Sequence, residues 1–176
     1  MRVWQALVLA LLWATTAGAP AGAVTGDEVP PPPRDPAQEA YAAGLAAFEA
    51  GDWQGVIDRM AQVIDVRPWH ADAHNRAGFA WRKLGDYDRA LAFYGKALEL
   101  NPHHRGALEY LGEAYLELDR PEDARALLER LATECRRVAS DAGDWRARCE
   151  EWQDLKEAYD GYRAAQPEAA AAGEKP

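Results

Sequence analysis

A pattern that recurs every 34 residues limits the folds open to this chain. Gly51-Asp52-Trp53 is followed 34 positions later by Gly85-Asp86-Tyr87, and Pro68 by Pro102. A period of this length indicates that each unit is one helical hairpin, which cannot bury its apolar face alone and must stack on its neighbours. The sequence therefore predicts an all-α solenoid of antiparallel helix hairpins.

Three units follow one another, at residues 37–70, 71–104 and 105–138. The second helix of each unit carries apolar residues at helical spacing, which predicts one buried stripe per helix. These residues are Ile57, Met60 and Val63, then Ala90, Tyr94 and Ala97, then Ala124, Leu128 and Leu131. Gly44, Gly78 and Gly112 repeat at the same interval and should let neighbouring helices approach closely.

The turn inside each unit needs a residue that tolerates a positive φ angle. Gly51 and Gly85 supply it in the first two units, and Asp119 takes that position in the third. Glycine has no Cβ to clash in this conformation, and Asp tolerates it better than most residues. Asp52 and Asp86 follow the two glycines and suit the positive end of the next helix.

The segment Gly85-Asp86-Tyr87, Ala90, Tyr94 and Lys96 to Pro102 resembles a tetratricopeptide repeat with nearly every signature position filled. The resemblance extends over residues 37 to about 134. Within the family, the chain is similar to exported bacterial members. Ala47 departs from it, because a large aromatic residue is usual there. Arg136 stands where the closing proline would be, as expected if the third repeat is the last.

Cys135 and Cys149 are the two cysteines of the chain, and we expect them to form a structural disulfide. A second helical run, predicted over 144–165, follows the loop 140–143, with Asp144 as its N-cap. Its acidic residues, namely Glu150, Glu151, Asp154 and Glu157, would give a polar outer face. The predicted element is a capping helix tied to the solenoid by the disulfide. Exported relatives with a similar cysteine pair before a C-terminal helix support the same interpretation.

Residues 1–23 have the features of a secretory signal peptide. Arg2 gives a positive start, Val3–Ala14 is almost entirely apolar, and small residues follow. We expect cleavage after Ala23, with Ala19 as the alternative site; an uncleaved N-terminal anchor is the competing interpretation. Residues 24–36 are predicted to be a Pro-rich linker and 166–176 a disordered tail. The protein is expected to be exported, and so periplasmic or secreted.

The charge of the chain disfavours two classes of partner. The formal net charge is −9, from 29 acidic and 20 basic residues. Such a surface repels phosphate groups and anionic lipids, so we predict neither nucleic-acid binding nor peripheral membrane binding.

Catalytic and metal-binding patterns are weak. His70 and His74 have the spacing of two ligands on one helix face, but no third ligand is evident. The sole serine, Ser140, has no base placed near it by any motif. We therefore predict no enzyme activity, no cofactor, no metal and no small-molecule substrate.

The resemblance implies that the first helices of the repeats line a concave groove for a peptide or protein partner. The positions it assigns to this groove are Tyr41, Leu45, Phe48, Asn75, Arg76, Phe79, Arg82, Lys83, Glu109, Tyr110, Glu113 and Glu117. They predict an aromatic start, a basic centre and an acidic end. The other interpretation is that Phe48 and Phe79 complete the core and the charges are ordinary surface.

The family's best-known groove holds a C-terminal carboxylate with Lys, Asn and Arg side chains. The positions that would need these Lys, Asn and Arg side chains hold Tyr41, Leu45, Gly106 and Tyr110 here. A clamp of this kind is therefore disfavoured. We expect a non-catalytic protein-interaction scaffold of the cell envelope, monomeric in solution. The alternatives are a subunit of an envelope assembly bound through its convex face or its cap (Trp145, Trp152), and an oligomer that self-stacks through the N-terminal helix.

Overall fold

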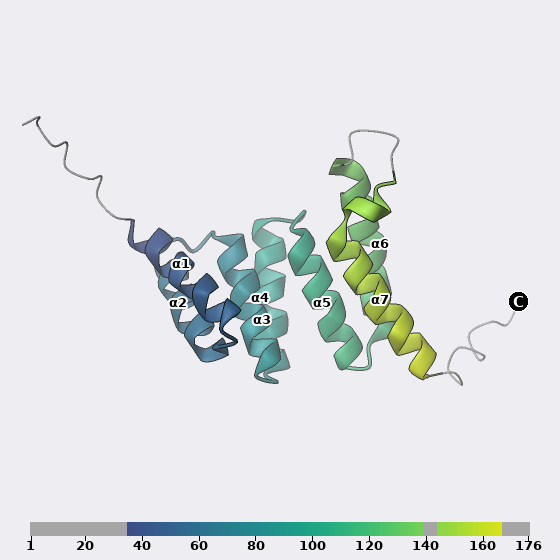
Figure 1. Ribbon diagram of the computed structural model, residues 1–176, viewed down its shortest axis with the longest axis horizontal. Helices are drawn as coiled ribbons and strands as arrows, with labels where there is room; N and C mark the ends of the chain where they lie inside the picture. The colour runs from purple at the N-terminus through teal and green to yellow at the C-terminus, as the bar shows by residue number, and fades with distance from the viewer. Residues whose placement is uncertain (1–34, 139–143, 167–176) are drawn as a thin grey trace, which may run out of the picture. The chain divides into compact units, whose positions relative to one another are not determined.

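The computed structural model describes residues 35–138 and 144–166, and within these ranges every regular element is helical (Figure 1). The elements are α1 (Pro36–Glu49), α2 (Trp53–Val66), α3 (Ala71–Lys83), α4 (Tyr87–Leu100), α5 (Arg105–Glu117), α6 (Pro121–Val138), the 3₁₀ helix η1 (Arg146–Arg148) and α7 (Glu150–Ala165). The predicted all-α fold is confirmed. The expected signal peptide, nearly all of the linker, the loop 140–143 and the tail beyond Gln166 lie outside the described residues.

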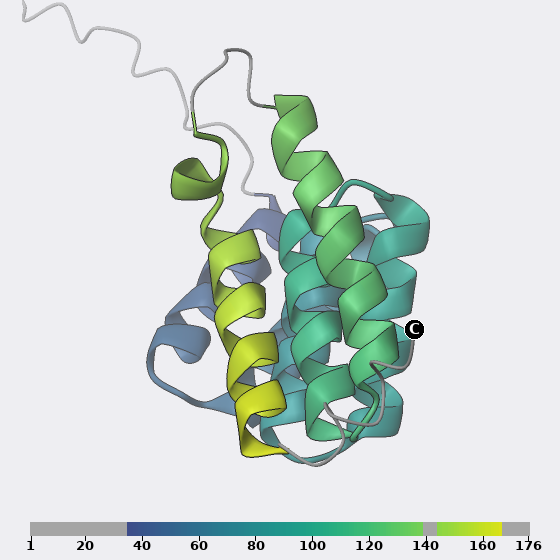
Figure 2. The ribbon, with the colours of Figure 1, turned by 90° about the vertical axis from the view of Figure 1, so that its right-hand side faces the viewer.

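Helices adjacent in the sequence pack as neighbours in space. The most extensive contacts join α1 with α2, α3 with α4, and α5 with α6, while α2 meets α3 and α4 meets α5. The closing helix α7 lies against both α5 and α6 (Figure 2). Each hairpin therefore buries its apolar face on the next one, as a solenoid requires.

The turns have the geometry that the sequence predicts. Gly51 and Gly85 have φ angles of 70° and 79°, and Asp119 has 57°. The Asp52 and Asp86 carboxylates cap α2 and α4 by accepting hydrogen bonds from backbone N–H groups in the first turn. At the start of the domain, Asp35 caps α1, so the helix begins at Pro36, inside the range that we assigned to the linker.

The core follows the predicted stripes with one exception. Met60 and Val63 of α2 are fully buried, but the third buried position is Val56, and Ile57 is only half-buried. The stripe therefore follows i, i+4, i+7 on α2 and not i, i+3, i+6. Gly78 allows the expected close approach, because a Cβ there would lie 2.9 Å from the ring of the fully buried Tyr94.

The cap is held as predicted but begins later. Cys135 and Cys149 form a disulfide, with Cα atoms 6.0 Å apart. The predicted helix start at Asp144 is wrong: its carboxylate accepts a bond from the N–H of Arg146 and opens only the short η1 turn. Cys149 is tied to α6 and has a backbone conformation outside the helical region, so α7 begins at Glu150.

Glu151 does not lie on the outer face of the cap. It is half-buried, and its carboxylate pairs with Arg105 of α5 at 3.3 Å. The fully buried Leu155 lies against Gly112, where a Cβ would come within 2.7 Å of its methyl groups. None of the helices in the described ranges combines the length and apolar character needed to cross a bilayer.

Candidate functional site

A row of aromatic rings runs across the first helices of the hairpins. The Phe48 ring of α1 lies 4.8 Å from the Phe79 ring of α3, which lies 4.8 Å from the Tyr110 ring of α5. All three side chains are half-buried. They are thus neither core residues nor isolated surface residues. We call the face of α1, α3 and α5 that carries this row, together with the adjoining face of α7, the groove.

Trp53 joins this aromatic row although it was not among the predicted groove residues. Its ring lies 5.6 Å from Phe48 and 5.7 Å from Phe79. It begins α2, directly after the turn. The aromatic residue at the end of the Gly-Asp-Trp motif was the available signal, but the motif was interpreted only as a turn.

Arg76 links the row to its two flanks. The guanidinium lies 4.7 Å above the Phe48 ring and close enough to the hydroxyl groups of Tyr41 and Tyr110 to oppose the rise that burial causes in the pKa of each. Tyr41 also packs on His70, with ring centroids 4.9 Å apart. Leu45 is half-buried on α1, one turn after Tyr41. Arginine above aromatic rings gives a polarised surface that can receive a peptide.

Arg82 is committed to partners inside the molecule. Its side chain is only 4 % exposed, and its guanidinium pairs with Glu113 at 2.6 Å and Glu117 at 3.3 Å. It lies 5.2 Å from the centre of the Phe79 ring. The predicted basic centre and acidic end thus neutralise each other in part, and Arg82 ties α3 to α5.

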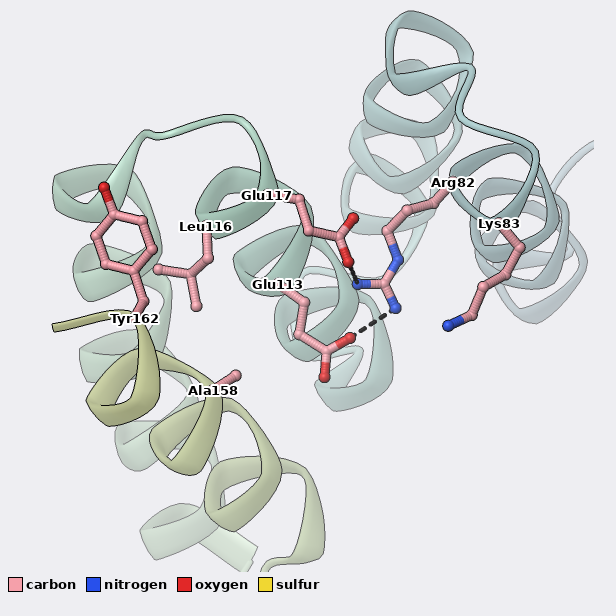
Figure 3. A pocket seen from close by; sticks show the side chains of 7 residues that line it. All are labelled: Arg82, Lys83, Glu113, Leu116, Glu117, Ala158 and Tyr162. Carbon is pink, nitrogen blue, oxygen red and sulfur yellow. Dashed lines mark hydrogen bonds and ion pairs between the residues drawn. The ribbon is translucent and has the colours of Figure 1, made fainter. Parts of the chain in front are cut away.

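A cavity of about 400 Å³ opens beside this ion-pair cluster (Figure 3). Its lining comes from α3, α5 and α7, namely Arg82, Lys83, Glu113, Leu116, Glu117, Ala158 and Tyr162. Leu116, Ala158 and Tyr162 form its apolar side and were not predicted as site residues. Two of them, Ala158 and Tyr162, are there only because α7 docks beside α5.

Two polar groove positions are buried. Asn75 and Glu109 are 4 % and 6 % exposed, and the Asn75 Oδ1 atom has no hydrogen-bond partner. Burial, followed by the carboxylates of Glu113, Asp154 and Glu151, raises the pKa of Glu109 to about 8 against the opposing effect of Arg82. A carboxyl group in this state is largely protonated at neutral pH.

Three of the four histidine rings bond to the backbone, and the fourth, His103, pairs with Glu134. His70 and His104 cap α3 and α5, each ring accepting from an N–H three residues on at 3.2 Å, and His74 is buried with Nε2 3.0 Å from the Pro68 carbonyl. Across residues 35–138 and 144–166, no three His, Cys, Asp or Glu side chains come together as a metal site.

The tryptophans of the cap are engaged with one another. Trp145 and Trp152 make an edge-to-face contact at 5.1 Å, and Arg146 lies over both rings. Both indoles are half-buried. This arrangement leaves less free aromatic surface at the cap than the sequence suggested.

Family models described as tetratricopeptide repeat match residues 41–96 and 82–134. The chain contains tetratricopeptide repeats. The family resemblance drawn from the Gly85–Pro102 segment is thereby confirmed for the repeats themselves. A bacterial source, export and the exact repeat count remain predictions.

Curated relatives share the repeats over part of their length. The chain is 34% identical over 96 residues to an FK506-binding protein-like protein of Mus musculus, covering 53% of this chain and 27% of that one. It is 35% identical over 71 residues to a tetratricopeptide repeat protein 36 homolog of Nematostella vectensis, covering 40% and 39%. The chain thus spans well under half the length of these relatives.

Solved structures show the same fold. A complex of the TPR2B domain of yeast Sti1 with pHsp70 superposes with a TM-score of 0.64 at 20% identity, over 74% of this chain and 98% of that one. The first TPR of Spaghetti (RPAP3), bound to the HSP90 peptide SRMEEVD, gives 0.58 at 19%, over 72% and 92%. PcrH in complex with the chaperone-binding region of PopD gives 0.61 at 16%, over 73% and 92%.

Proposed function

We propose that this protein is a non-catalytic scaffold that binds an extended segment of a partner protein in the groove. The observation that carries the proposal is the half-buried aromatic row of Phe48, Phe79 and Tyr110, with Arg76 above it and the cavity at its end. Aromatic and arginine side chains dominate binding energy when a partner desolvates them. The three superposed structures are complexes with a peptide or protein partner, which supports the same role here.

The ligand differs in chemistry from the acidic peptide SRMEEVD. A carboxylate clamp needs free cations, but Arg82 is already paired with Glu113 and Glu117. Tyr41 and Tyr110 also occupy two of the positions where the clamp would need cationic groups. We therefore propose a groove that recognises a segment without relying on a terminal carboxylate.

Site-specific photo-crosslinking tests the groove. A photoreactive residue at Lys83, on the rim of the cavity, should capture the partner in source cells, and Arg76→Glu/Tyr110→Ala should abolish the product. The same probe at Lys96, an exposed position on α4, serves as the control site. Crosslinks from position 96 that survive the double substitution would instead assign binding to the second helices.

We also propose that the protein acts in the cell envelope after export. The proposal is supported by the signal-peptide pattern of residues 1–23 and by the disulfide, which is typical of oxidising compartments. N-terminal sequencing of protein from fractionated source cells tests it. A mature chain starting at Val24 in the envelope fraction is expected, and an intact Met1 in the cytosol would contradict it.

A further inference from the structure

The wall of the groove formed by α5 and α7 carries more carboxyl groups than cations. Five carboxylates contribute to it, namely Glu109, Glu113, Glu117, Glu151 and Asp154. Arg82 pairs with two of them and Arg105 with a third, Glu151. Within the part of the chain that the structure describes, Glu109 and Asp154 have no hydrogen-bond or ion-pair partner.

Helices α5 and α7 run in parallel, so the carboxyl groups of Glu109 and Asp154 lie at a similar height along the wall. Arg105 meets Glu151 at one end, Leu155 packs on Gly112 in the middle, and Tyr162 donates to Asp119 at the other end. Glu109 lies about one turn before Gly112, and Asp154 directly precedes Leu155, so both stand just before the middle of the wall. The apolar side of the cavity, with Leu116, Ala158 and Tyr162, lies further along the same wall (Figure 3).

Glu109 is an unusual group to leave without a partner. It is 6 % exposed, and three carboxylates act on it, Glu113 from its own helix and Glu151 and Asp154 from α7. The cation that acts on it, Arg82 of α3, is shared with Glu113 and Glu117. Burial and the neighbouring carboxylates favour the protonated form of Glu109, because an ionised carboxylate at this position lacks a cation of its own. A cation supplied from outside would stabilise the ionised form, so this wall is complementary to one.

We propose that the α5–α7 wall selects a partner segment with a Lys or Arg side chain at Glu109 and Asp154 and an apolar side chain in the cavity. This inference rests on the proposed groove function and adds the chemistry of its ligand. Glu109 and Leu116 are separated by about 10 Å along α5, at 1.5 Å per helical residue. An extended segment advances about 3.3 Å per residue, so the cation and the apolar residue stand about three positions apart.

Selection from a random heptapeptide library on the full chain tests this ligand. Peptides displaced by Arg76→Glu/Tyr110→Ala should be enriched in Lys or Arg three positions from an apolar residue. Their affinity should fall at least tenfold for Glu109→Gln/Asp154→Asn, which keeps the shape and removes the charges. Glu122→Gln/Glu129→Gln on α6 removes the same charge at exposed positions and should change affinity less than twofold.

A pH titration separates direct pairing from a structural effect. A bound cation lowers the pKa of Glu109, so peptide binding should release a proton and strengthen as pH rises from 6 to 8. Glu109→Gln should remove this dependence. Groove-directed peptides without a cation preference, or with unchanged affinity for Glu109→Gln/Asp154→Asn, would overturn the inference and leave the groove function standing. Enriched peptides that Arg76→Glu/Tyr110→Ala does not displace would overturn both.

Discussion

Single buried side chains give this fold chemical properties that its repeat pattern does not predict. Tyr41, Asn75 and Glu109 occupy equivalent positions on α1, α3 and α5. The Tyr41 hydroxyl lies beside Arg76, Asn75 is buried with an unpartnered oxygen, and Glu109 has a pKa of about 8. One repeat position thus performs three different tasks, because each side chain meets a different neighbouring helix.

Glu109 should make the stability of the protein fall with rising pH. Its folded pKa of about 8 exceeds 4.5, the ordinary value of a glutamate carboxyl group, so the folded state holds its proton to a higher pH than the unfolded state. Its contribution is fully present below pH 4.5 and is lost progressively by pH 8. Urea unfolding should therefore show Glu109→Gln gaining stability relative to the wild type from pH 5 to pH 8. A difference that does not change with pH would contradict this prediction.

Two helical glycines should respond in opposite ways to alanine. A Cβ at Gly95 meets nothing within 4 Å, so Gly95→Ala should stabilise the protein by about 1 kcal/mol through helix propensity. A Cβ at Gly112 would lie 2.7 Å from the buried Leu155, so Gly112→Ala should cost about 1–2 kcal/mol net. Chemical denaturation of both variants gives the comparison, and equal effects would refute the close contact of α5 with α7.

Pairs of elements are joined by a few specific contacts in addition to apolar packing. The Arg82 cluster ties α3 to α5 across the groove, and the disulfide ties α6 to the start of α7. Both contacts border the cavity or the wall that we assign to the ligand. The shape of the groove therefore depends on them.

Removing Arg82 should loosen the contact of α3 with α5. Arg82→Met leaves Glu113 and Glu117 unpaired and should lower the free energy of unfolding by about 2–4 kcal/mol. The triple variant Arg82→Met/Glu113→Gln/Glu117→Gln removes the unpaired charges and should recover at least half of the loss. Equilibrium urea unfolding measures both, and no recovery in the triple variant would argue against the charge explanation.

Reduction of the disulfide should release the cap more than the repeats. The bond closes a loop with a sequence separation of 14, which the chain-entropy model values at about 3 kcal/mol. Hydrogen exchange should become faster in α7 on reduction, while α3 and α4 keep their protection. Leu155→Ala with the bond intact is the matched packing perturbation, at about 2–5 kcal/mol. Unchanged exchange in α7 would show that packing alone holds the cap.

The whole domain is stabilised by contacts between neighbours. Among the described helices α1 packs mainly on α2, whereas α3 and α4 have neighbours on both sides. In such an arrangement the stability of a unit depends on its own helices and its adjacent interfaces. Native-state hydrogen exchange should therefore be at least about tenfold faster in α1 than in α4. Equal protection in both helices would indicate a single cooperative unit.

The site was less predictable from the sequence than the fold. The groove positions on α3 and α5 follow from the repeat register, and Phe79, Tyr110 and Arg76 do come together. The ion pairs of Arg82 with Glu113 and Glu117 could not be predicted from the sequence, because both carboxylates are on the next repeat. The contribution of Ala158 depends on how α7 docks.

The sequence alone determined the helices of the repeats, their turns and their stacking order, because the 34-residue period, the caps and the positive-φ residues are local signals that each repeat carries for itself. Tertiary structure decided which charges remain available. Whether Arg82, Glu109 and Glu151 are paired, buried or free depends on side chains from other helices, and no local pattern encodes those distances. The ligand chemistry that we propose therefore depends on the tertiary structure and not on the local sequence pattern.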